Sequence, residues 1–199
     1  IAALMVWMVI RFGPGPVPGT EGEHWFQIAN LDVGILWVLA ISSLSVYGAV
    51  LGAWASNSGF SLLGGLRTAA QMISYEVTIG LNLVGLFMIF GSLQLNDIIW
   101  GQGELLWGWL PKWGIVVQPI GFVLFMVAAV AEVKRAPFDL PEDESVLGAG
   151  YFTEFSAMRF AVFALGEFIG IIVMSALAAC LFLGGWQIPW VDTPLLADG

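Results

Sequence analysis

Residues 132–160 read EVKRAPFDLPEDESVLGAGYFTEFSAMRF, and they join two of the most apolar runs in the chain. The sequence has 15 acidic and 6 basic residues in all, and nine of them fall in this one stretch. Aromatic side chains such as Phe138, Tyr151, Phe152 and Phe155 are interleaved with the charges. A loop that is only solvated needs no such aromatic residues. The pattern therefore predicts a charged loop that packs against another surface.

The composition on either side of this stretch is typical of an integral membrane protein. Hydrophobic residues make up 59% of the sequence, charged residues make up 11%, and the mean hydropathy is +0.89. A soluble domain has about a quarter charged residues. A transmembrane helix needs about 20 predominantly apolar residues. Four runs meet this requirement, at residues 31–54, 68–91, 115–133 and 156–183.

We therefore predict an all-α, polytopic integral membrane protein with four full transmembrane helices. Residues 1–10 (IAALMVWMVI) are apolar but too short to span, so we expect them to be the end of a fifth helix. The chain starts without Met inside this apolar run, and we interpret it as an internal part of a longer protein. Residues 1–199 are expected to form a single transmembrane helical domain.

The sequence offers little for metal or nucleic-acid chemistry. Cys180 lies in an apolar run, His24 lies in a polar loop, and each is the only residue of its type. One thiolate cannot hold an iron–sulfur cluster, and one imidazole supplies too few ligands for a zinc site. We therefore expect no metal site. The net charge of −9 argues against nucleic acid as a partner.

The basic residues predict which way the spans run. If the four spans alternate, the side that carries the charged loop holds four basic residues and the other side holds two. By the positive-inside rule, the acidic loop at 134–155 then faces the cytoplasm, or the matrix of an organelle. The four are Arg67, Lys134, Arg135 and Arg159, and the two are Arg11 and Lys112.

The local sequence predicts where the third span ends. Pro137 disfavours helical geometry at Ala136, so the helix is expected to end there. Glu132 and Arg135 are three residues apart and would then meet on one helical turn.

Two glutamates lie where a membrane protein rarely carries charge. Glu76 follows Arg67 by nine residues and Glu167 follows Arg159 by eight, which places both carboxyls roughly 12–13 Å into their helices. A charged group there costs about 2.5–3.5 kcal/mol on insertion scales, and such residues usually mark ion pathways. With Glu132 at the end of one helix and Glu154 before another, we predict a proton path. A neutral, hydrogen-bonded structural role for each glutamate stays open.

Two stretches carry a close family resemblance. The run AEVKRAPFDLPEDESVLGAGYFTEFSAMRFAVFALGEF (131–168) resembles the signature of the NuoH family, a membrane subunit of proton-pumping NADH:quinone oxidoreductase, respiratory complex I. The run GAWASNSGFSLLGGLRTAAQMISYEV (52–77) is similar to a second signature of the same family, whose mitochondrial counterpart is NADH dehydrogenase subunit one. The family has eight membrane helices and an amphipathic helix. By that pattern the chain lacks the first helix, the amphipathic helix, most of the second helix and the last two.

The resemblance implies a function within a larger enzyme. Such a protein forms the membrane side of the quinone chamber and starts the row of buried glutamates that couples quinone reduction to proton translocation. It carries no redox centre, so NAD, FMN and iron–sulfur clusters would bind in partner subunits. The substrate would be ubiquinone or menaquinone. The partners would be the peripheral-arm quinone-site and iron–sulfur subunits, small membrane subunits and lipid. The location would be the bacterial inner membrane or the mitochondrial inner membrane.

The resemblance also assigns candidate residues. The proton path would use Glu76, Glu132, Glu154 and Glu167. The coupling loop would use Arg135, Asp139, Glu142, Asp143 and Glu144, and the quinone chamber Phe138, Arg159 and Phe160. Some family members carry a glutamate where this chain has Ser43, so the row would be one carboxylate shorter here. Phe155 and Phe168 replace tyrosines that are common in the family.

We interpret the charge density of the loop as a response to quinone chemistry. Charge changes at the quinone would shift protonation or conformation in the loop and pass the change to the buried glutamates. Three other interpretations stay open. The chain could be the homologous membrane component of a hydrogenase-type complex, a stand-alone ion carrier, or a non-catalytic anchor for a peripheral arm.

Overall fold

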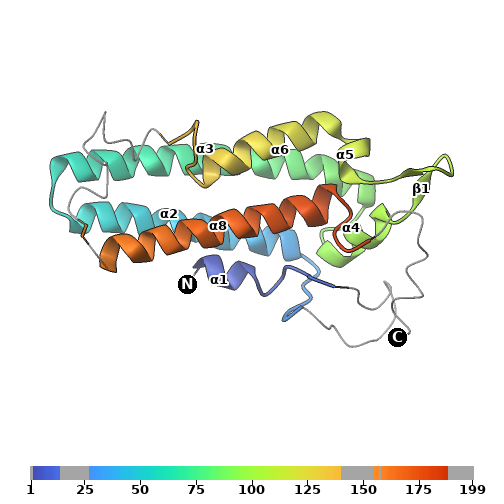
Figure 1. The fold of residues 1–199 in the computed structure, drawn as a ribbon, viewed down its shortest axis with the longest axis horizontal. Helices are drawn as coiled ribbons and strands as arrows, with labels where there is room; N and C mark the ends of the chain where they lie inside the picture. Colours follow the sequence, from blue (N-terminus) through green and yellow to red (C-terminus); the bar gives the residue numbers. More distant parts are fainter. Residues whose placement is uncertain (1, 14–26, 140–154, 157, 188–199) are drawn as a thin grey trace.

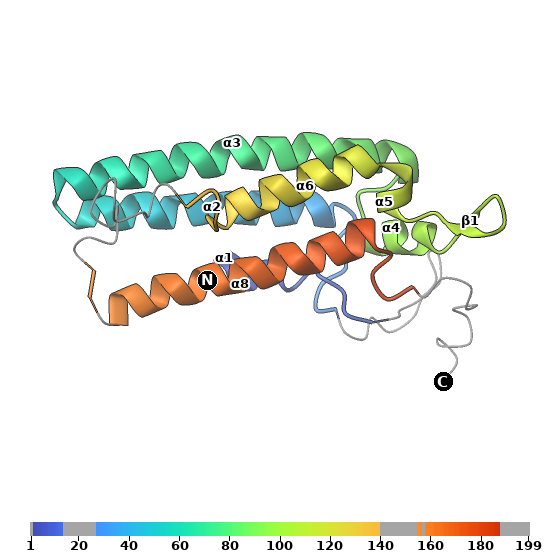
Figure 2. The same ribbon diagram turned by 45° about the horizontal axis from the view of Figure 1, so that its top comes forward.

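The computed structural model describes residues 2–13, 27–139, 155–156 and 158–187 as a bundle of helices (Figure 1). The main helices are α2 (Gly34–Ala55), α3 (Gly59–Phe90), α6 (Pro119–Glu132) and α8 (Met158–Phe182), which lie side by side in both views (Figures 1 and 2). A short helix α1 (Ala2–Val6) packs against α2 and α8. Four candidate site residues, Glu142, Asp143, Glu144 and Glu154, lie outside the described residues.

Three of the described helices are long and apolar enough to cross a membrane, namely α2, α3 and α8. The prediction of a polytopic, all-α membrane protein is confirmed. Helix α3 begins at Gly59 and contains 32 residues, well ahead of the predicted span at 68–91. At 1.5 Å per residue it is about 48 Å long, which exceeds the roughly 30 Å hydrocarbon layer.

The third predicted span, at residues 115–133, is divided in the structure. Helix α5 (Gly114–Val117) ends at Gln118, and α6 starts at Pro119. Gln118 has φ −135° and ψ 68°, outside the helical region, because the ring of a following proline disfavours helical geometry. Helix α6 therefore has only 14 residues, and the run at 115–133 is not one continuous helix.

Helices α2 and α3 form a tight antiparallel pair through small residues. A Cβ added at Gly65 would collide with the Cβ of Ala53, so the two backbones approach as closely as glycine permits. Small residues at such a crossing let helices gain packing contacts inside a membrane, where lipid is as apolar as the side chains.

The end of the bundle opposite the α2–α3 turn is held by a buried amide. Gln102, the last residue of α4 (Leu95–Gln102), donates from Nε2 to the carbonyl of Cys180 at 2.8 Å. Its Oε1 accepts from the backbone N–H groups of Gly114 at 3.1 Å and Gly184 at 3.0 Å. One side chain thereby joins α4, α5 and the end of α8. A two-stranded hairpin, β1 (Leu105–Leu106) and β2 (Leu110–Pro111), projects from this end (Figure 1).

Helix α6 stops well short of the opposite end of the bundle, where α2 turns into α3 (Figures 1 and 2). Its last residue is Glu132, four residues before the predicted end at Ala136. The N–H of Lys134 bonds the carbonyl of Ala131 at 3.2 Å, and the N–H of Arg135 bonds that of Val130 at 3.2 Å. This pair of hydrogen bonds is a Schellman cap, and it ends the helix at Glu132, upstream of Pro137. Arg135 therefore does not continue the helix, and the expectation that it shares a turn with Glu132 was wrong.

Candidate functional site

Glu76 lies near the middle of α3 and receives hydrogen bonds from α2. The hydroxyls of Ser42 and Ser43 both face its Oε1, with Ser42 at 3.2 Å and Ser43 closer. Each hydroxyl also lies within hydrogen-bond distance of the carbonyl of Leu39, at 2.9 Å and 3.0 Å. A serine has a single O–H proton, so it can donate to the glutamate or to its own helix but not to both. The pair can therefore adapt to either protonation state of Glu76.

Glu132 closes α6 deep inside the bundle. Its side chain is 5% exposed, and in the part of the chain that the structure describes its Oε2 has no hydrogen-bond partner. Glu76 and Lys134 both lie within electrostatic range of this carboxyl. A buried polar atom without a partner is costly, and in native proteins it often marks a functional group or a water site.

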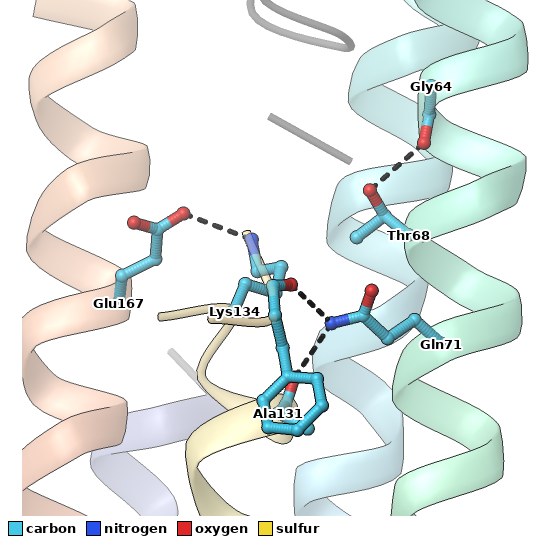
Figure 3. A network of polar contacts seen from close by, with 7 residues as sticks. Gly64, Thr68, Gln71, Ala131, Lys134 and Glu167 are labelled. Carbon is cyan, nitrogen blue, oxygen red and sulfur yellow. Dashed lines mark hydrogen bonds and ion pairs between the residues drawn. The ribbon is translucent and has the colours of Figure 1, made fainter. Parts of the chain in front are cut away.

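Glu167 on α8 forms an ion pair with Lys134 (Figure 3). The Lys134 Nζ lies 3.0 Å from the Glu167 Oε1, and the side chains are 7% and 16% exposed. Lys134 has a φ of 53°, in the left-handed region. A residue with a Cβ pays about 1–2 kcal/mol there, and a Schellman cap usually has glycine at this position. The pair links the first residue of the charged loop to the middle of α8.

Gln71 attaches the start of the loop to α3 (Figure 3). Its Nε2 donates to the carbonyl of Ala131 at 3.0 Å and to that of Phe138 at 2.9 Å. The ring of Phe138 lies against Tyr75, with ring centroids 5.6 Å apart. The chain from 131 to 138 is thereby tied to α3 at both ends.

The remaining described candidates lie further along the loop and at the start of α8. Arg135 is exposed, and its guanidinium lies 5.0 Å from the ring centroid of Phe168 on α8. The Phe168 ring thus offers an aromatic face to this cation. Asp139 is the last described residue before the gap and is exposed. Arg159 and Phe160 are exposed in the first turn of α8.

A cavity of about 470 Å³ lies beside the ion pair. The residues around it come from α1, α2, α3, the end of α6 and α8, and most are small or apolar. Its charged lining residues are Glu132, Lys134 and Glu167. A cavity of this size has room for several water molecules beside its charged side chains, since one water occupies about 30 Å³ of liquid. Phe138, Arg159 and Phe160 do not line it.

The structure thus brings Glu76, Glu132 and Glu167 into one region from three helices. The sequence analysis did not single out Lys134, Gln71 or Ser42 as site residues. Gln71 and Ser42 carried a signal, because a polar residue within an apolar run needs a partner. The partner could not be named, because it lies on another element. Within the described ranges, no group of three His, Cys, Asp or Glu side chains could hold a metal ion.

Comparison with known proteins identifies the family. A family model described as NADH dehydrogenase matches residues 1–197. The chain belongs to the NADH dehydrogenase family. The resemblance found in residues 52–77 and 131–168 is therefore confirmed.

Similar proteins of the NADH dehydrogenase family occur in several bacteria. The NADH-quinone oxidoreductase H subunit of Thermomicrobium roseum is 53% identical over 201 residues, which cover 96% of this chain and 59% of that protein. The H subunit numbered 1 of the same enzyme in Geobacter metallireducens is 49% identical over 191 residues, 96% of this chain and 56% of that protein. The H subunit of Anoxybacillus flavithermus is 48% identical over 184 residues, 90% of this chain and 52% of that protein. The chain spans somewhat more than half the length of these relatives.

Proposed function

We propose that this chain is part of the membrane subunit of NADH:quinone oxidoreductase that forms the quinone-binding chamber and the start of a glutamate path for protons. The observation that carries the proposal is the convergence of Glu76, Glu132 and Glu167. They come from three different helices and lie in the interior of a membrane-spanning bundle. The names and high identities of the bacterial relatives support the assignment to this enzyme.

The physical argument rests on the cost of ionisable groups in a membrane. Each such group is expensive, and a fold keeps it only with polar partners or water. Glu76 has the two serine hydroxyls, Glu167 has Lys134, and the carboxyls of Glu132 and Glu167 line the cavity. A proton could then pass between Glu167 and Glu132 through water in this cavity and reach Glu76 next. Ser42 and Ser43 would take the place of the additional glutamate that some family members carry.

The quinone chamber and the coupling loop are further parts of the proposal. The residues that would border the quinone are Phe138, Arg159 and Phe160. The residues that would respond to its reduction are Arg135, Asp139, Glu142, Asp143 and Glu144. The start of the loop is attached to the bundle at two points. Gln71 on α3 bonds the carbonyl of Phe138, and Lys134 pairs with Glu167 on α8. These contacts support a loop that passes a conformational or charge change to the bundle.

The cofactors, partners and location follow from the same proposal. Quinone, ubiquinone or menaquinone, is the substrate. Electrons reach it from an iron–sulfur cluster in a partner protein of the complex, and NAD and FMN also bind in partner proteins. The site of action is a bacterial inner membrane, with the 134–155 loop on the cytoplasmic side.

The test replaces Glu167 with Gln in the complete complex, in membranes. We expect the complex to assemble at its normal level, while NADH:quinone reductase activity and proton pumping both fall at least about tenfold, a loss of about 1.4 kcal/mol of transition-state stabilisation. Glu104→Gln is the matched control, because Glu104 forms an exposed ion pair with Lys112 at the hairpin. Full activity and pumping in Glu167→Gln would mean that this glutamate has only a structural role.

A further inference from the structure

The backbone of Lys134 has a conformation that is unfavourable for any residue with a Cβ atom. It is the left-handed residue of the Schellman cap that ends α6, with a φ of 53°. Glycine is the usual residue at this position because it has no Cβ. Non-glycine residues in strained backbone conformations persist where the surroundings over-determine them, and they cluster at functional sites. The cap alone would be served better by glycine, so the reason for lysine lies in its side chain.

The side chain of Lys134 crosses from the end of α6 to α8. Its ammonium group is buried and lies 3.0 Å from the Glu167 carboxylate (Figure 3). Among the described residues, charged groups in this region include Glu132 on α6, which interacts electrostatically with Lys134 and with Glu76 on α3. Arg135 lies over the ring of Phe168. A buried ammonium is as costly as a buried carboxylate, so the two charges stabilise each other only while they stay together.

We propose that Lys134 is a positioning residue that keeps Glu167 ionised and ties its protonation to the seating of the loop start. This inference rests on the proposed function, in which Glu167 belongs to the proton path. When the segment 133–138 lies against α3, the ammonium holds the carboxylate of Glu167 in its charged form. When the segment moves away, Glu167 loses the nearby ammonium of Lys134 and takes up a proton from water in the adjoining cavity. When the segment returns, the proton leaves to the same water.

In the described part of the chain, a single hydrogen bond from α3 holds the far end of this segment. Gln71 donates to the carbonyl of Ala131, in the last turn of α6, and to that of Phe138, at the end of the segment, and Lys134 lies between these two residues in the chain. A displacement of Phe138 that breaks its hydrogen bond with Gln71 also moves Lys134, which lies four residues earlier in the chain. A displacement of this segment can thus change the charge of a carboxylate in the middle of α8.

The test measures the protonation of Glu167 directly. A lipophilic carbodiimide reacts with carboxylic acids in their protonated form, and mass spectrometry of the complete complex in membranes gives the labelled fraction at residue 167. We expect at least about tenfold more label in Lys134→Met than in the unmodified complex at neutral pH, because the loss of a nearby cation favours the neutral form of a buried carboxyl. Acidified, unmodified membranes establish that the reagent reaches Glu167.

Two further Lys134 variants separate this role from a role in the helix cap. Lys134→Gly relieves the strained cap but removes the cation, so it should label as strongly as Lys134→Met. Lys134→Arg keeps a cation and should label as weakly as the unmodified complex. Lys112→Met, which breaks the exposed pair with Glu104, should leave the label at Glu167 unchanged.

The outcomes separate this inference from the proposed function. Unchanged labelling in Lys134→Met and Lys134→Gly would overturn the role of Lys134. Strong labelling in these variants supports it, even where Glu167→Gln keeps full pumping. Full pumping in Glu167→Gln would refute the proton path through Glu167. The ion pair with Lys134 would still determine the charge of Glu167.

Discussion

The hydroxyl of Ser43 on α2 donates a hydrogen bond to the carboxyl of Glu76 on α3. Ser42, its neighbour in sequence, donates to the same oxygen at 3.2 Å. Two adjacent serines therefore hold one membrane-embedded glutamate across the closely packed α2–α3 pair. Ser43 thus has a specific partner on the neighbouring helix.

The double variant Ser42→Ala, Ser43→Ala tests this contact. It removes both donors from α2, and a hydrogen bond to a charged group contributes about 1.5–3 kcal/mol. We expect normal assembly with coupled quinone reduction reduced about tenfold, measured in membranes together with proton pumping. Ser175→Ala is the control, because Ser175 is exposed and bonds the carbonyl of Ile171 in its own helix. If the double variant pumps normally, the hydroxyls do not support a functional charge on Glu76.

Gln71→Glu tests the attachment of the loop start to α3. The substituted side chain keeps the size of glutamine, but its carboxylate cannot donate to the carbonyls of Ala131 and Phe138. We expect faster hydrogen exchange in the segment 133–139 and lower coupled activity, while the helices keep their protection. Hydrogen–deuterium exchange with mass spectrometry makes the measurement.

The matched control for Gln71 is Ser74→Ala on the same helix. The Ser74 hydroxyl is exposed and bonds the carbonyl of Ala70 at 2.7 Å within α3. Its removal should leave exchange in 133–139 unchanged. Equal exchange in the two variants would show that Gln71 does not hold the loop.

Gly65→Ala tests the close approach of α2 and α3. The added methyl group would collide with Ala53, and overpacking of this kind typically costs about 1–3 kcal/mol. We expect a lower melting temperature of the purified complex and less assembled complex in membranes. Gly80 on the same helix has open space around it, so Gly80→Ala should be neutral or stabilise the helix by up to about 1 kcal/mol. A Gly65→Ala variant as stable as the Gly80→Ala variant would contradict the packing.

Much of the fold could be predicted from local pattern. Long apolar runs have to form helices in a membrane, because the backbone finds no other hydrogen-bond partners there. This constraint predicted α2 and α8 with boundaries close to those observed, and the end of α3. It failed at Gln118, and the separate argument from Pro137 placed the end of α6 at Ala136 instead of Glu132. At Gln118 a proline interrupts an apolar run, and at Glu132 the helix is closed by a cap whose left-handed residue is lysine.

The candidate site could be predicted only in part. A glutamate in an apolar run signals a buried carboxyl, so Glu76 and Glu167 were identifiable from sequence. Lys134 gave no comparable signal, because a lysine in a charged loop is ordinarily solvated. Its partner lies 33 residues away on another helix, and the pairing depends on the early end of α6.

The sequence by itself determined that the chain is a helical membrane protein, that charge is concentrated between two spans, and that carboxyls are buried within them. These features follow from composition and spacing, which act locally along the chain. Only the tertiary structure decided which polar groups meet. Ser43 with Glu76, Gln71 with Phe138 and Lys134 with Glu167 each join different elements. Such pairs depend on how the helices pack, since a buried polar group takes whichever partner the packing brings within hydrogen-bond distance.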